Sequence, residues 1–361
     1  MAKKTKRMKK PLKIFLIVLA SILAIVLGYL AYVFISYDRI DDNVVLTADV
    51  EGAPSNEEVQ VGTEYTIVTY NIGYGAYTSD YSFFMDGGKS SWAKSEEDLK
   101  TNIDNIGNVL KDIDADFVVL QEVDTDGTRS YHYNEYQRLR EMLGSGNYIF
   151  AQNFHSAFLM YPILEPHGKN NSGIVTATEF QIDNAIRRQL PISTSFSKVL
   201  DLDRCYSITR IPVNDGKMLC IYNMHISAYG ADDSIREGQI NMLFEDMCKD
   251  YEQGNYVICG GDYNHNLRET DNGNAPDWAQ LFPREKIPAG FSLAFEKAYS
   301  QDTALDTCRN TDIPYEEGKT FTVMVDGFIV SDNVAVTTYE NTDIGFKYSD
   351  HNPVVMSFIL G

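Results

Sequence analysis

Basic side chains are scarce in most of this 361-residue sequence. It holds 31 Lys and Arg against 51 Asp and Glu, a formal net charge of −20. The first 37 residues contain seven of the bases and no acid, so the remainder has 24 bases against 51 acids, or −27. Such a surface excludes the binding of polyanions through a broad basic patch. It does not exclude an enzyme that acts on phosphoesters with a bound cation, because the cation bridges two negative partners.

Cysteine is also scarce, with five residues, no CxxC pair and no spacing typical of a metal site. Cys220 and Cys259 lie inside apolar, strand-like runs, where a thiol behaves as a small hydrophobic group. One disulfide is compatible with five cysteines outside the cell, but their odd number and wide spacing do not specify which residues would pair. The sequence after residue 62 shows no internal repeat and no low-complexity segment.

Charge is missing altogether from Ile14 to Ile35, a run of 22 residues. At about 1.5 Å per residue such a helix spans the ~30 Å hydrocarbon core of a bilayer. Tyrosine and phenylalanine occupy the place where a signal peptide has its small-residue cleavage site, which favours a retained anchor over a cleaved signal or a buried core helix. We therefore predict a membrane-spanning helix over 14–36.

The flanks of this helix predict a topology. The basic tail 1–13 is expected in the cytoplasm, because positive flanks stay on that side. The rest of the chain would then be extracellular, as part of a single-pass cell-membrane protein. Residues 37–62 are acidic and contain glycine and proline, so we expect a linker there and one folded domain over 63–361.

The folded part alternates between short apolar runs and amphipathic helical patterns. An Asp215-Gly216 pair joins two alternating runs, which is a strong signal for a β-hairpin. Mixed strands, hairpins and helices over about 300 residues predict an α/β sandwich. The expected strands are 66–71, 116–122 and 255–261, the expected helices are 96–113 and 234–254, and the hairpin is 205–226.

Polar side chains that suit metal binding and acid–base chemistry stand repeatedly at the ends of these apolar runs. They are Asn71, Glu122, Asn223 with His225, Asp262 with Asn264, Asp326, and Asp350 with His351. Ligand-binding residues in α/β folds gather outside strand ends. Taken singly, most of these residues are typical of turns, solvated rims or satisfied core groups. Asp326 is the exception, because an acid inside the apolar run VMVDGFIV needs a partner.

The order of these motifs resembles the endonuclease/exonuclease/phosphatase superfamily, which has the DNase I-like fold. The resemblance covers about residues 64–361, and its most specific parts are QE at 121–122, GGDYN at 260–264 and SDHNPV at 349–354. The family includes pancreatic-type deoxyribonucleases, abasic-site endonucleases, neutral sphingomyelinases and inositol polyphosphate 5-phosphatases. The resemblance implies a four-layer sandwich of two mixed sheets with helices outside.

The resemblance also implies a metal site. Asn71 and Glu122 match the family's first metal-site pair, and Asp350 would lie near the same ion. Carboxylate oxygen is the ligand that Mg²⁺ prefers. Mn²⁺ shares the same oxygen ligands, so the sequence does not separate the two ions.

Five further residues match the family's catalytic positions. Asp262 resembles the residue that orients or deprotonates the attacking water, and Asn264 would position that water or a phosphate oxygen. The two are expected at period two on an extended segment, so that they face the same side. His351 resembles the histidine that contacts the scissile phosphate, with Asp326 as its carboxylate partner. His225 resembles a second phosphate-facing histidine. The implied chemistry is in-line attack of water on a phosphoester.

Some features stay open from sequence alone. Four arginines are rare bases in an acidic domain and fit either substrate phosphate or ordinary salt bridges: Arg187, Arg188, Arg204 and Arg210. The aromatic, glycine-rich insertion 74–95 fits either a substrate loop or a lid packed into the core. Three histidines match no family position and are expected on surface loops: His132, His155 and His167.

We expect a membrane-anchored, outward-facing, Mg²⁺-dependent phosphoester hydrolase. A small or lipid-linked phosphoester, with a lipid head group as partner, is favoured over nucleic acid, since the helix holds the site near lipid and the domain carries about −27. One alternative is an extracellular nuclease, in which nucleic acid would be the substrate that is cleaved and not a binding partner. The second is a non-catalytic binding ectodomain, which the complete set of metal and acid–base positions disfavours.

Overall fold

The computed structural model describes residues 9–195, 198, 202–227, 233–270, 275–276, 278–298 and 305–361. The chain forms two compact units, residues 1–39 and residues 40–361. The first unit is the helix α1 (Lys10–Ile35), which carries charge only at Lys10 and Lys13 in its first turn. By length and composition α1 is a candidate membrane span, although a signal sequence near an N-terminus meets the same criterion. The predicted span 14–36 coincides with it apart from the first turn and Ser36.

The second unit is built on two seven-stranded sheets. The first sheet contains, in spatial order, β1 (Val44–Leu46), β7 (Asn184–Gln189), β8 (Cys205–Pro212), β9 (Met218–His225), β10 (Tyr256–Asp262), β14 (Asp326–Ser331) and β11 (Phe291–Leu293). The second contains β15 (Val334–Asn341), β16 (Val354–Leu360), β3 (Glu64–Asn71), β4 (Phe117–Gly127), β6 (Asn170–Thr178), β5 (Gly146–His155) and β2 (Asp49–Glu51). Both sheets are mixed, because β9 pairs in parallel with β10 and β3 with β4.

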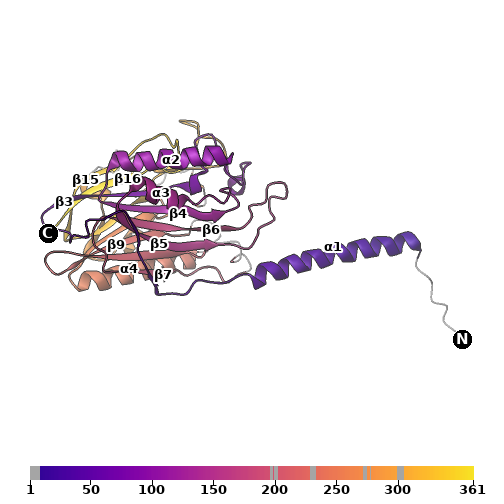
Figure 1. Cartoon of the computed structure of the whole chain (residues 1–361), viewed down its shortest axis with the longest axis horizontal. Helices are drawn as coiled ribbons and strands as arrows, with labels where there is room; N and C mark the ends of the chain where they lie inside the picture. Colours follow the sequence, from indigo (N-terminus) through magenta and orange to yellow (C-terminus); the bar gives the residue numbers. More distant parts are fainter. Residues whose placement is uncertain are drawn as a thin grey trace. The chain divides into compact units, whose positions relative to one another are not determined.

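Helices cover the outer faces of the two sheets (Figure 1). Those next to the second sheet are α2 (Glu96–Ile113) and α3 (Glu135–Leu143), and the first sheet is covered by α4 (Asp233–Glu252). The smaller elements are α5 (Phe295–Ala298), the paired strands β12 (Cys308–Arg309) and β13 (Thr322–Val323), and the 3₁₀ turns Gly73–Gly75, Phe84–Asp86 and Arg284–Lys286. The predicted four-layer sandwich is confirmed.

The helix α2 shows why the sequence-based expectation succeeds. Ser95 caps it by accepting a hydrogen bond from the Asp98 amide at 3.1 Å, and acids fill its first turn. Leu99, Ile103 and Leu110 are buried on one face, as helical spacing predicts. This apolar face packs in a core cluster with residues of β3 and β4.

The segment 37–62 differs from the linker that the sequence predicts. Val44–Leu46 pairs with β7, and Asp49–Glu51 pairs with β5, so each forms an edge strand of a sheet. The buried guanidinium of Arg187 also donates to the Asp41 carbonyl at 3.2 Å. Three-residue edge strands with mostly exposed side chains leave no apolar periodicity, which is why they have no signature in the sequence.

The two sheets are joined near the ends of their parallel strands. The Gln121 side chain on β4 donates to the Asn223 side chain on β9 at 2.8 Å, and Asn223 donates to the Val175 carbonyl at 2.8 Å. Both side chains are fully buried, so each polar atom that is paired here avoids a desolvation cost. These hydrogen bonds fix the relative position of the strand ends that carry the candidate residues.

Candidate active site

The end of β10 is shaped by a glycine. Gly261 has φ +147°, and a Cβ there would lie 2.0 Å from the Met224 carbonyl oxygen, so only glycine lets β10 approach β9 this closely. Asp262 follows directly and is buried. The sequence suggests an extended Asp262-x-Asn264 segment, but Asn264 has φ +47° and its amide donates to Asp262 Oδ1 at 2.8 Å. A turn of this kind, rather than strand periodicity, brings both side chains to the same pocket.

Glu122 reaches the site through a β-bulge. The register of β4 against β6 shifts between Leu120 and Val123, and Glu122 has φ +56°. Bulges commonly redirect a side chain next to a functional site, and a left-handed non-glycine residue costs about 1–3 kcal/mol of strain. The surrounding sheet holds this conformation and turns the Glu122 carboxylate toward the end of β3.

Asn71, at the end of β3, positions two carboxylates. Its Nδ2 donates to Glu122 Oε1 at 3.2 Å and to Asp262 Oδ2 at 3.1 Å. Its Oδ1 accepts from the Gly73 amide at 3.0 Å, and its carbonyl accepts from Ser349 Oγ at 2.8 Å. The sequence assigns Asn71 to the metal site, and the structure shows its amide as the group that orients the neighbouring acids.

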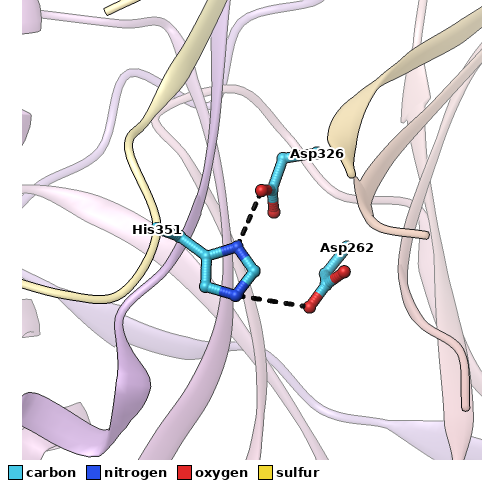
Figure 2. Close-up of side chains that lie close together, drawn as sticks. All are labelled: Asp262, Asp326 and His351. Atoms are coloured by element: carbon cyan, nitrogen blue, oxygen red, sulfur yellow. Dashed lines mark hydrogen bonds and ion pairs between the residues drawn. The ribbon is translucent and has the colours of Figure 1, made fainter. Parts of the chain in front are cut away.

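The imidazole of His351 lies between two carboxylates (Figure 2). Its Nδ1 is 2.7 Å from Asp326 Oδ2, and its Nε2 is 3.8 Å from Asp262 Oδ2. Burial opposes the charge on His351, but the negative groups around it, Asp326 first, raise its pKa well above the ordinary value. These negative groups favour the imidazolium form of His351. Its Nδ1–H is held by Asp326, while 3.8 Å is too long for a hydrogen bond from Nε2.

His225, at the end of β9, is also buried but has the opposite character. Burial, followed by the positive charges of Arg204 and His351, lowers its pKa well below the ordinary value. Its Nε2 lies 3.5 Å from Asp262 Oδ2 and 3.9 Å from Glu122 Oε1. Because the ring is neutral, these contacts are polar rather than ionic. Two histidines thus reach one acidic cluster, one charged and one neutral.

Three carboxylates, the buried Asp262 and the partly buried Glu122 and Asp350, carry more negative charge than their surroundings neutralise. Burial raises the pKa of Asp262 to about 6 and that of Asp350 to about 7, although His351 partly offsets the effect in both. Burial also raises the pKa of Glu122. A cluster of hard oxygen donors held at a pKa above the normal range is the environment that a divalent cation stabilises, so the donor set fits Mg²⁺ or Mn²⁺.

A second compact group overlaps this cluster. One ligand atom each from Asp262, Asp326 and His351 lies within 4.8 Å of the others, which is close enough to surround a metal ion. Within that group, however, Asp326 Oδ2 is already engaged with His351 Nδ1, and a protonated imidazole is not a ligand. The carboxylates of Glu122 and Asp350, which lie outside that group, are therefore the better cation donors.

A pocket of about 200 Å³ contains all of this chemistry. One set of lining side chains, the acidic set, consists of Glu122, Asp262 and Asp350; a fourth lining acid, Asp86, accepts a hydrogen bond from Thr311. Another, the cationic and aromatic set, consists of Arg129, Arg204, Arg309, His167, Tyr77, Phe83, Phe154 and Trp278. The pocket also includes His225, Asn264 and His351. Of the predicted site residues, only Asn71 and Asp326 do not line it; they contact side chains that do.

Among the four arginines that the sequence left open, only Arg204 lines the pocket. Arg187 donates to the carbonyls of Gln152 and Asp203, Arg188 pairs with Asp42 and Asp246, and Arg210 pairs with Asp250. Arg204 is 5 % exposed, yet its Nε and Nη1 have no hydrogen-bond partner among the described residues. A buried guanidinium in that state is suited to an anionic ligand.

His167 was expected on a surface loop, and this expectation is wrong. The side chain is 7 % exposed, lies 5.8 Å from the Phe84 ring and lines the pocket. Its neighbours in sequence, Pro166 and Gly168, suggest a loop, and nothing local reveals that the insertion 74–95 packs over it. The other two unmatched histidines are less buried: His132 is exposed and His155 intermediate.

The insertion 74–95 combines the two roles that the sequence left open, because part of it packs into the core and part of it lines the pocket. Tyr74 and Tyr81 are buried in the core cluster beneath the second sheet's outer face, whereas Tyr77 and Phe83 also line the pocket.

The structure shows no disulfide bond, since all five cysteines lie in the described ranges and all are free thiols.

Comparison with known proteins places this geometry in a family. Residues 68–351 match the model of the Endonuclease/Exonuclease/phosphatase family. None of the curated proteins matches the sequence significantly.

Solved structures share the fold at low sequence identity. A protein described as endonuclease/exonuclease/phosphatase from Beutenbergia cavernae has a TM-score of 0.60 at 16 % identity, covering 82 % of this chain and 72 % of that one. A family protein from Leptotrichia buccalis has 0.55 at 17 %, covering 81 % and 99 %. TDP2 from D. rerio, in complex with a single-strand DNA product, has 0.54 at 15 %, covering 82 % and 99 %.

Proposed function

The chain belongs to the endonuclease/exonuclease/phosphatase family and is a phosphoester hydrolase, and we propose that it is a membrane-anchored, Mg²⁺-dependent phosphodiesterase or phosphatase. Its substrate would be a small or lipid-linked phosphoester. The observation that carries the proposal is one buried pocket in which three carboxylates stand next to an imidazolium held by its own acid. The first group suits a cation, and the second suits the phosphoryl oxygens that the cation would share.

Asp262 is the proposed base for the attacking water. Its Oδ2 is oriented by the Asn71 amide, and its Oδ1 accepts from the Asn264 amide, so the carboxylate cannot rotate freely. Water would attack phosphorus in line with the ester oxygen, and its proton would pass to Asp262. The P–O ester bond would break, and the departing alkoxide would take a proton from solvent water and leave as the alcohol. A bound Mg²⁺, held by Glu122 and Asp350, would supply Lewis-acid stabilisation of the charge on the transferring group.

His351 is the proposed oxyanion-stabilising group. Asp326 fixes its Nδ1–H, so Nε2–H is free to donate to a phosphoryl oxygen. Such preorganised donors in a dry site stabilise developing charge more than they do in water. The neutral His225 donates or accepts a second hydrogen bond, and Arg204 would bind another phosphate oxygen.

Three features support a small or lipid-linked phosphoester over nucleic acid. The domain carries about −27, which opposes the docking of a long polyanion. The pocket is small and partly aromatic rather than a long basic channel. The helix α1 is a candidate span, and we propose that it anchors the chain in the cell membrane, with the N-terminus in the cytoplasm and the domain outside.

A hydrolysis screen of the full chain in detergent tests the proposal. Bis-p-nitrophenyl phosphate, sphingomyelin, inositol phosphates and plasmid DNA would each be offered with Mg²⁺ and with EDTA, beside Asp262→Asn as the inactive control. We expect metal-dependent turnover of a small or lipid phosphoester that the variant loses. Turnover of plasmid DNA alone would assign the nuclease alternative, and turnover that persists in EDTA would reject the metal-dependent mechanism.

A further inference from the structure

Residues 156–168, which make up most of the connection between β5 and β6, expose an unusual amount of apolar surface and are called the apolar hairpin. Within it the large side chains Met160, Tyr161, Ile163 and Leu164 are 53 %, 70 %, 83 % and 99 % exposed. No charged residue occurs between His155 and Glu165. Single exposed hydrophobic residues are common on proteins, but a contiguous apolar patch marks an interaction surface.

This hairpin is held in place rather than loosely attached. Leu159 and Gly168 exchange two backbone hydrogen bonds of 3.0 Å. The base is clamped to the insertion 74–95, because Ser91 N donates to Glu165 Oε2 at 3.0 Å and Trp92 Nε1 donates to the Pro166 carbonyl at 2.6 Å. These bonds hold apolar side chains exposed to water. Exposure of apolar surface is unfavourable in free energy, and contact with a partner surface would remove that cost.

The hairpin is continuous with the mouth of the pocket. Tyr161 packs on Phe84 with ring centroids 5.7 Å apart, and His167, at the hairpin's base, lines the pocket. Met85, next to Phe84, is 65 % exposed and also lines the pocket. Whatever covers the hairpin therefore lies beside the entrance through which substrate passes.

We propose that the apolar hairpin inserts into the head-group boundary of a lipid bilayer and so presents the pocket mouth to lipid. The chemistry matches, because the tip combines branched aliphatic side chains with a tyrosine and no charge, as membrane-interface segments do. The rest of the domain is strongly acidic, which disfavours nucleic acid and other anionic partners at this place.

The chain itself supplies the means of reaching a bilayer. Only the four residues 36–39 separate the end of α1 from the folded unit that begins at Ile40, and the five steps from Ile35 to Ile40 span at most roughly 17 Å. With α1 seated in a membrane, docking of the hairpin becomes an intramolecular event with a high effective concentration. The docking does not depend on hydrolysis; only its consequence, that a lipid phosphoester is the substrate, rests on the proposed function.

Collisional quenching tests the insertion directly. Leu164→Trp and Val50→Trp would each be made in the full chain and reconstituted in phosphatidylcholine nanodiscs with or without bromine on the acyl chains. Val50 is 58 % exposed and pairs with Asn147, at the opposite end of β5, about 30 Å along the strand from the hairpin. We expect brominated lipid to quench the tryptophan at 164 and to leave that at 50 unchanged.

A second pair of variants connects docking with catalysis. Ile163→Glu with Leu164→Glu places two charges at the tip, where exposure leaves the fold unaffected, and Val50→Glu is the matched control. We expect the double variant to raise KM for a lipid-presented phosphoester roughly tenfold or more, since two apolar side chains no longer enter lipid. Hydrolysis of soluble bis-p-nitrophenyl phosphate should not change.

The outcomes separate the two proposals. Equal quenching at both positions, or none at 164, overturns the docking. A tryptophan at 164 that becomes shielded without lipid as protein concentration rises assigns the surface to a second copy of the chain, and shielding by added DNA assigns it to nucleic acid; both reject the proposal. Quenching at 164 with no lipid hydrolysis keeps the docking and rejects only the lipid substrate.

Discussion

The two sets of side chains that line the pocket bury charge in different ways. In the acidic set, Glu122 and Asp262 share the Asn71 amide, and no cationic side chain in the described ranges donates a hydrogen bond to either. In the cationic and aromatic set, Arg129 makes a bidentate pair with Asp124, at 3.0 and 2.8 Å, and lies 3.6 Å from the centroid of the Tyr74 ring. A buried charge with internal partners supports the fold, whereas one without them is available to a ligand.

Arg204 is the instructive exception on the cationic side. It is as buried as Arg129, at 5 % against 7 % exposed, but its Nε and Nη1 lack acceptors in the described part of the chain. It also lowers the pKa of the neighbouring His225. On this comparison we propose that the acidic carboxylates and Arg204 are functional charges and that Arg129 is a structural one.

The largest expected effect is on the acidic set. Asp262→Asn keeps the shape and the hydrogen bond from Asn264 N but removes the base, so kcat should fall about 10³-fold. The thermal midpoint should not fall, because burial already raises the pKa of this carboxyl and charge there is unfavourable. Steady-state kinetics and thermal unfolding would measure the two effects. A loss of activity that is matched by a loss of folded protein would contradict the catalytic role.

The arginine comparison is tested by one change at each position. Arg129→Gln should destabilise the protein by about 3 kcal/mol, because it leaves Asp124 buried without its bidentate partner. Arg204→Gln should leave stability unchanged or raise it, while increasing KM for a phosphoester. Denaturant unfolding with substrate kinetics separates them, and a large loss of stability in Arg204→Gln would place that residue in the structural class.

Metal dependence tests whether the carboxylates of the acidic set serve a cation rather than the fold. Glu122→Gln replaces a proposed metal ligand by its neutral isostere, so the Mg²⁺ concentration for half-maximal activity should rise roughly 10²-fold. In EDTA the same variant should be no less stable than the unmodified chain, because it removes one of several repelling carboxylates. Mg²⁺ titration of activity and calorimetry in EDTA check both signs. Destabilisation in EDTA would show that Glu122 has a structural partner instead.

Much of the fold, and the convergence of the candidate site residues, could be predicted from sequence. The strand β3 is rich in β-branched and aromatic residues and β10 begins as an apolar run, and the polar residues that end them keep a family order. Their convergence follows once β3 pairs with β4 and β9 with β10 in parallel, since parallel strands end at the same edge.

What could not be predicted depends on non-local geometry. The bulge at Glu122 arises from the register between β4 and β6, and the turn at Asn264 replaces the extended segment that the motif suggests. The edge strand β1 is too short to have a pattern. The burial of His167 depends on the clamp between Ser91 and Glu165, which are far apart in sequence, so no local signal exists for it.

The smallest expected effect concerns His167, which belongs to the cationic and aromatic set. Burial, and then the charge of Arg129, lower its pKa to about 4 from the ordinary value of 6.5. Its folded pKa is below the unfolded one, so its contribution to stability is complete above pH 6.5 and is lost as the pH falls towards 4.

Between pH 7 and pH 5 this loss should amount to roughly 2 kcal/mol, and His167→Gln should remove it. Because His225 titrates in the same direction and Asp262 in the opposite one, the diagnostic quantity is the difference between variant and unmodified chain. Urea unfolding at several pH values measures that difference, with His132→Gln as the exposed control. If both variants change the pH dependence equally, the neutral, buried state of His167 is rejected, and with it the view that the cationic set excludes further positive charge.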